Sequence, residues 1–476
     1  MAVSGRYVAV AIQLVGSLVV ARLLSPTDFG LFSIAASVVA VTASVREFGI
    51  TSYLVQVQPL DREALGRAVA FTTSLSLAIG VPLFLGRGLV AEFFGDARVA
   101  GLIGILSLNF VLVPFSIGTV AKLQRQLRFG LLNLANLGHT LIAMLATVGL
   151  AWWGFGAASL AIGQVVQMVA MVALLAAVEP STVFCRPVFT GMAPMLRFGS
   201  FSALTGVVYQ AGNYGTSIIL GRMLGPAMVG FFDRGNGLFQ TVNNDLVGAV
   251  GQVLYVGVAQ ARDEPAALAA LCRRSLGNLA GAIWPGYALL AALADPIIIV
   301  MFGPQWTQSV PVLQVLCVAG VLAAGYVVHA RLLLAHGRTA TLFGIEATGQ
   351  AVRLIAVLLL AGFGLVAAAC GAVIAAVALA VLYLVAARRV LVISGAEVAG
   401  IFGHGLVIAV ATAALPALLV ATDPWGLSRF ALAAVGGTLG VCCWIASLYA
   451  TGHSMAGELS RMARKAGEML ALGVAK

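Results

Sequence analysis

The sequence predicts an all-α polytopic membrane protein of about fourteen transmembrane helices, arranged as two parallel six-helix repeats plus two C-terminal helices. Hydrophobic residues make up 61% of the 476 residues and charged residues only 9%, too few to give so long a chain a hydrated surface. The apolar runs are roughly 18 to 25 residues long, which is the length a helix needs to cross about 30 Å of hydrocarbon. An internal repeat predicts how the helices are grouped.

The repeat consists of three pairs of matching segments, in the same order and at two offsets. Ala21–Phe32, ARLLSPTDFGLF, returns 200 residues later as Gly221–Phe232, GRMLGPAMVGFF. A Phe-Gly pair at 94–95 returns 208 residues later at 302–303, and GFGAASLAIG returns as GFGLVAAACG. Because the matches include Pro and Gly and keep their order, we interpret them as a duplicated unit rather than as chance recurrence.

The predicted spans follow one another with short connections. They are approximately 5–24, 29–47, 67–86, 99–121, 130–152, 156–178, 200–220, 229–257, 275–300, 308–330, 340–361, 364–386, 399–420 and 427–449. We expect the first to be a retained helix rather than a signal peptide, because its counterpart before Arg222 lies in mid-chain. The spans give an N-terminal six-helix lobe (1–178), an interlobe connector (179–198), a C-terminal six-helix lobe (199–390), two additional helices (391–450) and a basic tail (451–476). The tail fits either a short amphipathic helix or a solvated end.

The positions of the basic residues predict the orientation. With the N-terminus in the cytoplasm, inside segments hold twenty of the 27 Lys and Arg residues, outside segments hold six, Arg234 among them, and Arg353 lies within a span. This bias agrees with the positive-inside rule. Each repeat then has an even number of spans, so both start from the cytoplasm and are related by an axis along the membrane normal. Both termini are expected in the cytoplasm, and the net charge of +10 needs no nucleic-acid partner.

The sequence has no motif for catalysis, a cofactor or a metal. None of the three lysines, Lys122, Lys465 and Lys476, follows a glycine, so a Walker A loop is absent. The five histidines are scattered, and the six cysteines lack zinc-ligand spacing. We therefore expect a protein that is not an enzyme, with no cofactor and no metal site.

Polar residues inside the predicted spans are the candidate binding residues, because polarity within hydrocarbon is costly. The fifth span carries Asn136 and His139, and its repeat counterpart carries Glu346, Gln350 and Arg353. The seventh and eighth spans add Asn213, Gln240 and Asn244. Such groups either join helices through hydrogen bonds of about 1 kcal/mol or less each, or line a water-accessible cavity between the lobes, as in a carrier. Amides suit a sugar because they both donate and accept hydrogen bonds.

Four segments carry a resemblance: ARLLSPTDFGLF, the Glu-Phe-Gly at 47–49, ILGRMLGPAMVGFFDRGNGL and the MFGPQW run at 301–306. They resemble the polysaccharide-transport family, whose superfamily also holds multidrug extrusion carriers and lipid II flippases. The resemblance covers nearly the whole chain, and FGPQW is its most specific part. It implies two six-helix lobes around a central cavity, alternating access, and an undecaprenyl-pyrophosphate-linked oligosaccharide as cargo. Relatives often carry Arg and Asp where this chain has Asn213 and Thr216, so the resemblance assigns no charged pair there.

The sequence therefore predicts a flippase that moves a lipid-linked oligosaccharide from the inner to the outer leaflet of the bacterial inner membrane, for surface polysaccharide or exopolysaccharide synthesis. An ion gradient, of H⁺ or Na⁺, or removal of the product would drive it, and a polysaccharide polymerase complex is an expected partner. Two alternatives stay open. A multidrug or small-amphiphile antiporter predicts a more acidic and aromatic cavity, and a non-transporting scaffold for glycan assembly would tolerate neutral replacements of the polar residues.

Arg353 is the expected ligand of the cargo's anionic phosphate, with Glu346 as its counter-charge when the site is empty. The two residues are seven apart on one face of a helix, or about 10.5 Å along its axis, so Gln350 would bridge them. A central arginine that faced lipid would be penalised, which favours the cavity. The competing expectation is a structural Arg353, paired with a carbonyl or with Asp245.

Overall fold

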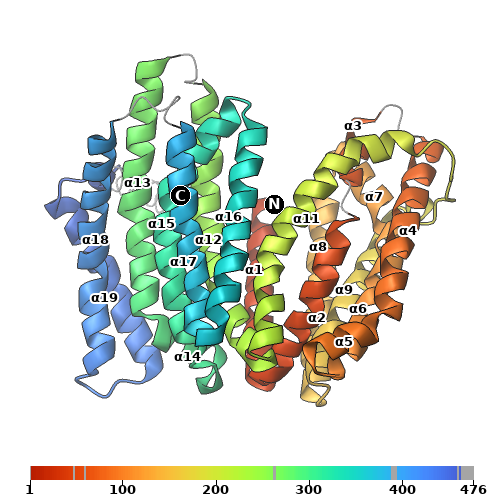
Figure 1. Cartoon of the computed structure of the whole chain (residues 1–476), viewed down its shortest axis with the longest axis horizontal. Helices are drawn as coiled ribbons and strands as arrows, with labels where there is room; N and C mark the ends of the chain where they lie inside the picture. The colour runs from red at the N-terminus through yellow and green to blue at the C-terminus, as the bar shows by residue number, and fades with distance from the viewer. Residues whose placement is uncertain are drawn as a thin grey trace, which may run out of the picture. The chain divides into compact units, whose positions relative to one another are not determined.

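The structure is a computed structural model that describes residues 2–46, 49–57, 61–260, 264–387, 394–457 and 460–461. Within these residues the chain is helical and forms no β-strand, so the all-α prediction is confirmed (Figure 1). The helices form two compact units, residues 1–233 and 234–476. Helix α12 (Pro226–Gln260) belongs to the first unit at its start and to the second along the rest of its length.

The described residues of the first unit form eleven α-helices and the start of α12. They are α1 (Ala2–Leu23), α2 (Pro26–Ser44), α3 (Ile50–Gln56), α4 (Arg62–Leu85), α5 (Arg87–Phe94), α6 (Arg98–Leu112), α7 (Pro114–Arg125), α8 (Phe129–Trp152), α9 (Ala157–Val178), α10 (Pro180–Val183) and α11 (Ala193–Met223). Polar caps begin two of the long helices. The Ser25 hydroxyl accepts a hydrogen bond from the Asp28 N–H of α2 at 3.1 Å, and the Asp61 carboxylate accepts one from the Ala64 N–H of α4 at 2.7 Å.

In the second unit, the residues that the structure describes form the rest of α12 and seven further α-helices. They are α13 (Pro265–Ala292), α14 (Ala294–Phe302), α15 (Ser309–Ala335), α16 (Thr339–Leu360), α17 (Leu365–Ala387), α18 (Gly395–Thr422) and α19 (Arg429–Ala450). The last two are the predicted additional helices. They pack on this unit, because α18 lies along α13 and the Trp444 indole of α19 donates to the Gly281 carbonyl of α13 at 2.7 Å.

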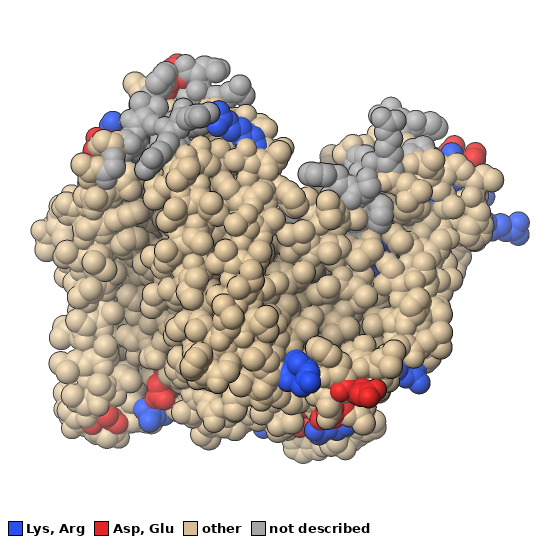
Figure 2. All heavy atoms as spheres, viewed as in Figure 1, with Lys and Arg blue, Asp and Glu red and all other residues tan. Residues whose placement is uncertain are grey.

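The chain is a multi-pass membrane protein. Among the described residues, nine helices are long and apolar enough to cross a membrane, or eleven if each of two bent pairs is one span. These correspond in order to eleven of the predicted spans. The other three fall on α1, α11 and α12, where some side chains are not described, so the number fourteen stays a prediction. In the space-filling view, charged residues lie mainly near the two ends of each unit and leave an uncharged band between them (Figure 2).

Two spans predicted as continuous are bent, which corrects the sequence prediction. The span 99–121 is α6 followed by α7 at an angle of 48°, and the span 275–300 is α13 followed by α14 at 67°. Pro114 is the first residue of α7. Because proline has no N–H and its ring clashes with the preceding turn, the helix bends there. The repeat counterpart of α6 and α7 is α15, which is a single helix.

The helix order shows the repeat. The offset of 208 places α5 on residues 295–302, within α14, and both helices are followed by a glycine with positive φ, 71° at Gly95 and 105° at Gly303. The same offset places α8 and α9 on α16 and α17 with small shifts at the ends. The compact units divide between residues 233 and 234. The lobe boundaries at 178 and 199 stay predictions. The predicted tail lies mostly outside the described residues, which end at 461.

The two copies of the repeated segment meet inside the first unit. Gly30 of α2 packs against the start of α12 so closely that a Cβ there would overlap the carbonyl oxygen of Pro226. Reciprocally, a Cβ at Gly230 would overlap the carbonyl oxygen of Pro26. Only glycine allows backbones to approach this closely. The contact explains why Pro and Gly recur together in both copies.

Candidate functional site

A polar pocket lies at the bend between α6 and α7 in the first unit. It holds about 390 Å³ and is bordered by α8 and α9. Its lining residues are Asn109, Val113, Ser116, His139, Gln164, Gln167, Met168 and Met171. The pocket combines neutral hydrogen-bonding groups with two thioether side chains, and none of its described lining residues is formally charged.

His139 is the sequence-predicted residue that reaches this pocket. Its Nε2 lies 3.2 Å from Oδ1 of Asn136 on the same helix. Its Nδ1 is buried and has no hydrogen-bond partner among the described residues. Asn136 itself is exposed and does not line the pocket. The Nδ1 atom can therefore donate to or accept from a bound hydroxyl, depending on the tautomer.

Sequence reasoning missed the amides that face His139 across the pocket. Gln164 and Gln167 lie three residues apart on α9, and Asn109 lies one turn before the bend in α6. Residues three apart share a helix face. That spacing in an otherwise apolar span was the available signal for the two glutamines. No signal in the sequence joins them to His139, because packing alone brings α6, α8 and α9 together.

A second polar cluster lies in the other unit, where α15, α16 and α17 pack together. Tyr383 Oη donates to Glu346 Oε1 at 2.5 Å, and the rings of Tyr326 and Tyr383 stack with centroids 5.1 Å apart. Tyr383 is fully buried, so this charge-assisted bond fixes the carboxylate against α17. Arg353 is half buried further along α16. Gln350 Oε1 is buried between them and accepts no hydrogen bond from the described residues.

The remaining predicted residues lie beside polar contacts between helices. Asn213 and Gln240 are half buried, and Asn244 is exposed. The neighbouring Asn243 accepts a hydrogen bond from Tyr287 Oη at 2.8 Å, which joins α12 to α13 in the second unit. In the first unit, Ser217 Oγ donates to Asp233 Oδ1 at 2.8 Å and joins α11 to α12. Asp245 lies among the side chains that are not described, so its expected pairing with Arg353 is untested.

Arg234 is a buried cation in the first part of α12. The sequence analysis counted it with the outside residues, which stays a prediction, and the structure shows that it is only 6% exposed. Its guanidinium carbon lies 4.6 Å from the ring centroid of Phe302 and 4.9 Å from that of Trp306. These are cation–π distances, and the aromatic faces offset part of the hydration that the buried cation loses. The FGPQW run therefore packs on an arginine.

An apolar groove of about 340 Å³ lies in the second unit, between α13, α15 and α18. Its lining is mainly alanine and valine, with Trp284 and Tyr287, and no charged residue is among the described residues that line it. Transfer of a hydrocarbon chain from water to such a surface lowers the free energy.

The described part of the chain contains no group of three or more His, Cys, Asp and Glu side chains that could hold a metal ion.

The sequence of this chain is similar to a protein family and to several characterised proteins. The family described as polysaccharide biosynthesis protein matches residues 19–311. The chain belongs to this polysaccharide biosynthesis family. It is 23% identical over 323 residues to the lipopolysaccharide biosynthesis protein WzxC of Escherichia coli (strain K12), covering 66% of this chain and 64% of that protein. It is 25% identical over 315 residues to the succinoglycan biosynthesis transport protein ExoT of Rhizobium meliloti (strain 1021), covering 64% of this chain and 62% of that one. Each match thus spans less than two thirds of the relative's length.

Solved structures establish the fold of this family member. The lipid II flippase MurJ in an inward closed conformation matches with a TM-score of 0.75 at 12% identity, covering 94% of this chain and 97% of MurJ. An inward-facing multidrug resistance transporter of the MATE family, from the MOP superfamily, matches with a TM-score of 0.60 at 15% identity, covering 83% of this chain and 95% of that one. The chain therefore shares its fold with both proteins.

Proposed function

We propose that this member of the polysaccharide biosynthesis family is a flippase, which moves a lipid-linked oligosaccharide from the inner to the outer leaflet of the bacterial inner membrane by alternating access. The His139 pocket carries the proposal, because it places neutral hydrogen-bonding groups inside apolar helices. The family match and the names of the relatives support a glycan as cargo. The fold shared with a lipid II flippase supports a lipid-linked one.

The pocket chemistry suits a sugar. Each sugar hydroxyl donates and accepts a hydrogen bond, and the amides of Asn109, Gln164 and Gln167 offer both kinds of partner. His139 Nδ1 adds one more group without a partner among the described residues. A cationic ligand would instead need a carboxylate, and the described lining of this pocket contains none. The apolar groove of the second unit offers hydrocarbon chains a surface outside water.

The proposal includes an energy source for transport and a protein partner. Because the sequence has no Walker A loop, transport would depend on a gradient of H⁺ or Na⁺ or on removal of the flipped product. A polysaccharide polymerase complex that consumes the product in the outer leaflet would supply that removal. With both termini in the cytoplasm, the cargo would be loaded on the side where the glycan is built.

The second candidate function is a multidrug antiporter, which the likeness to the MATE transporter favours. An antiporter of cationic drugs needs carboxylates exposed to its cargo. In the described part of the second unit, Tyr383 donates directly to the Glu346 carboxylate. That bond favours a structural role for Glu346 over drug binding.

Gene deletion and complementation test the flippase directly. Deletion should stop export of one surface or secreted glycan, leave its lipid-linked precursor facing the cytoplasm, and leave sensitivity to cationic dyes unchanged. Complementation with His139→Ala should lower export about fivefold, because one neutral hydrogen bond contributes about 1 kcal/mol. His404→Ala is the matched control, since His404 is exposed on α18. Normal glycan with raised dye sensitivity after deletion would support the antiporter instead.

Arg353 is the proposed ligand of the cargo phosphate, and its variants test that role. We expect Arg353→Ala to reach the membrane at normal abundance but to lose export, and Arg353→Lys to retain part of it, because a cation at this depth pairs with phosphate. Glu346→Gln keeps a hydrogen-bond acceptor for Tyr383 and should fold normally. Full export from well-folded Arg353→Ala would end the phosphate role.

A further inference from the structure

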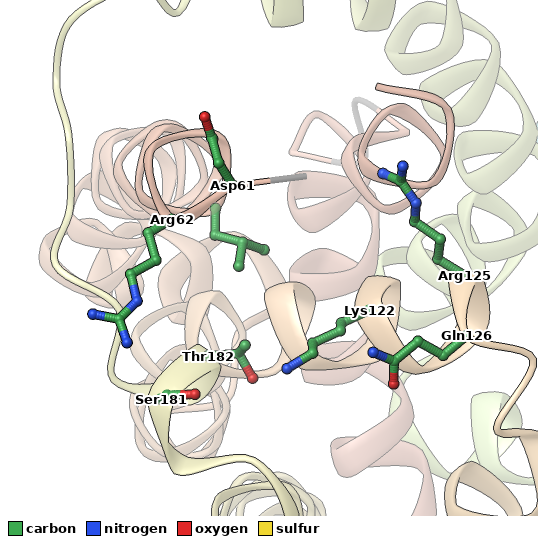
Figure 3. A pocket seen from close by; sticks show the side chains of 8 residues that line it. Asp61, Arg62, Lys122, Arg125, Gln126, Ser181 and Thr182 are labelled. Atoms are coloured by element: carbon green, nitrogen blue, oxygen red, sulfur yellow. The ribbon is translucent and has the colours of Figure 1, made fainter. Parts of the chain in front are cut away.

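A basic pocket at one end of the first unit takes no part in the proposed transport. It holds about 600 Å³ and lies where α4 begins, α7 ends and the short helix α10 passes (Figure 3). The basic residues that line it are Arg62 on α4 and Lys122 and Arg125 on α7. In the predicted orientation this end faces the cytoplasm.

The side chains divide into two groups by direction. Arg62, Lys122 and Gln126 extend toward the side of the pocket formed by α10, which contributes the Ser181 hydroxyl (Figure 3). Arg125 points away, and its guanidinium donates to the Val57 carbonyl at 2.7 Å. The group that faces the pocket therefore supplies two cations and two neutral hydrogen-bond donors.

The carboxylates near the pocket do not cancel these cations. Asp61 accepts the cap hydrogen bond of α4 from Ala64 at 2.7 Å. Glu179 lies 2.8 Å from Lys122 Nζ and 3.9 Å from a guanidinium nitrogen of Arg128, so one carboxylate is shared by two cations. Arg62 is exposed and forms no ion pair with any described residue. The pocket thus keeps an excess of positive charge, which an anion can neutralise.

The pocket lies at the level where lipid headgroups are found. Arg62 is the first residue of one membrane span, Arg62–Leu85, and Arg125 is the last residue of the bent span formed by α6 and α7. The ends of membrane spans lie at the border between hydrocarbon and water. The phosphates of lipid headgroups are the anions concentrated at that border, and basic pockets between helix ends on the cytoplasmic side bind them.

We propose that this pocket binds the phosphate of an anionic phospholipid of the inner leaflet, with Arg62 and Lys122 as cations and Gln126 and Ser181 as neutral donors. The phosphate would join three elements, of which α7 already contacts both α4 and α10. The hydroxyls of Thr119 on α7 and Thr182 on α10 share a hydrogen bond of 2.7 Å, and both side chains are buried. Because α10 starts the predicted interlobe connector, an occupied pocket holds the connector against the first unit.

Lipid binding to the purified full-length chain tests this site. Native mass spectrometry would count phosphatidylglycerol and phosphatidylethanolamine adducts, with inorganic phosphate as a competitor. We expect phosphatidylglycerol to be preferred, and Arg62→Gln to weaken its binding about fivefold, since one basic residue near the membrane surface contributes about 1 kcal/mol. Arg62→Lys keeps the positive charge and should therefore bind phosphatidylglycerol about as strongly as the native chain. Arg87→Gln, which removes the same charge just past the other end of α4, should leave it unchanged.

Two outcomes overturn the proposal. Equal binding of phosphatidylglycerol to the native chain and to Arg62→Gln would show that the lipid binds elsewhere. Displacement by millimolar inorganic phosphate, without preference between the two lipids, would assign the pocket to free phosphate instead. Glycan export is a separate readout, because lipid binding requires no cargo. If the flippase proposal fails, the lipid-binding result still holds. If the lipid-binding proposal fails, the proposed role of the His139 pocket is unaffected.

Discussion

Arg234 is a buried cation whose aromatic contacts come from the FGPQW run. The rings of Phe302 and Trp306 both lie within 5 Å of its guanidinium carbon, at 4.6 and 4.9 Å. A guanidinium is planar, delocalised and weakly hydrated, so it stacks on rings at a lower cost than an ammonium group. The side chain therefore joins α12 to the segment after α14, and its chemistry matters as well as its charge.

Arg234→Lys tests this at the scale of one residue. We expect the melting temperature of the purified protein to fall, with a loss of about 1–2 kcal/mol in the free energy of unfolding, because a buried ammonium replaces the stacked guanidinium. The matched control is Arg87→Lys. Arg87 also lies over a ring, 3.9 Å from that of Phe84, but Phe84 is exposed. Equal shifts in the two variants would contradict the role of burial.

At the scale of helices, two features shape the first unit. The close crossing of α2 with the start of α12 brings the two copies of the repeated segment together through Gly30 and Gly230. The bend at Pro114 separates α6 from α7 and leaves space that becomes the His139 pocket. Both depend on what a residue lacks, a side chain in one case and an N–H in the other.

Gly30→Ala should strongly destabilise the first unit. The added methyl would overlap the Pro226 carbonyl oxygen, so α2 and α12 would have to move apart, at a cost of roughly 1–3 kcal/mol or more. Gly101→Ala on α6 is the matched control, because a Cβ there meets no atom within 4 Å. That variant should be neutral or stabilised by up to about 1 kcal/mol. Thermal unfolding of both proteins is the measurement, and unchanged stability of Gly30→Ala would contradict the crossing.

At the scale of the whole molecule, helix order and charge distribution together predict the orientation. Equivalent elements follow one another in both halves, and each repeat has an even number of predicted spans. Equivalent loops should therefore face the same side of the membrane.

Single cysteines in a cysteine-free background test this orientation. Trp153→Cys and Phe363→Cys lie in equivalent loops and replace side chains that are 77% and 82% exposed. Both should react with a membrane-impermeant maleimide from the periplasm. Gln126→Cys and Thr339→Cys, at the other ends of α8 and α16, should react only after the membrane is opened. Labelling of positions 153 and 363 from opposite sides would exclude parallel repeats.

The sequence by itself determined the fold class, most membrane spans and the repeat, because a long apolar run and a matching segment can be read without knowing what they touch. It identified His139 as a candidate but not Gln164 or Gln167, and it did not predict that Arg234 is buried against Phe302 and Trp306. Only the tertiary structure decided these points. The His139 pocket joins residues of four helices, and the basic pocket joins Arg62, Lys122 and Ser181, which lie far apart in the chain. Burial and hydrogen bonding depend on which helix faces pack together, and that choice is made by contacts between distant segments rather than by local sequence.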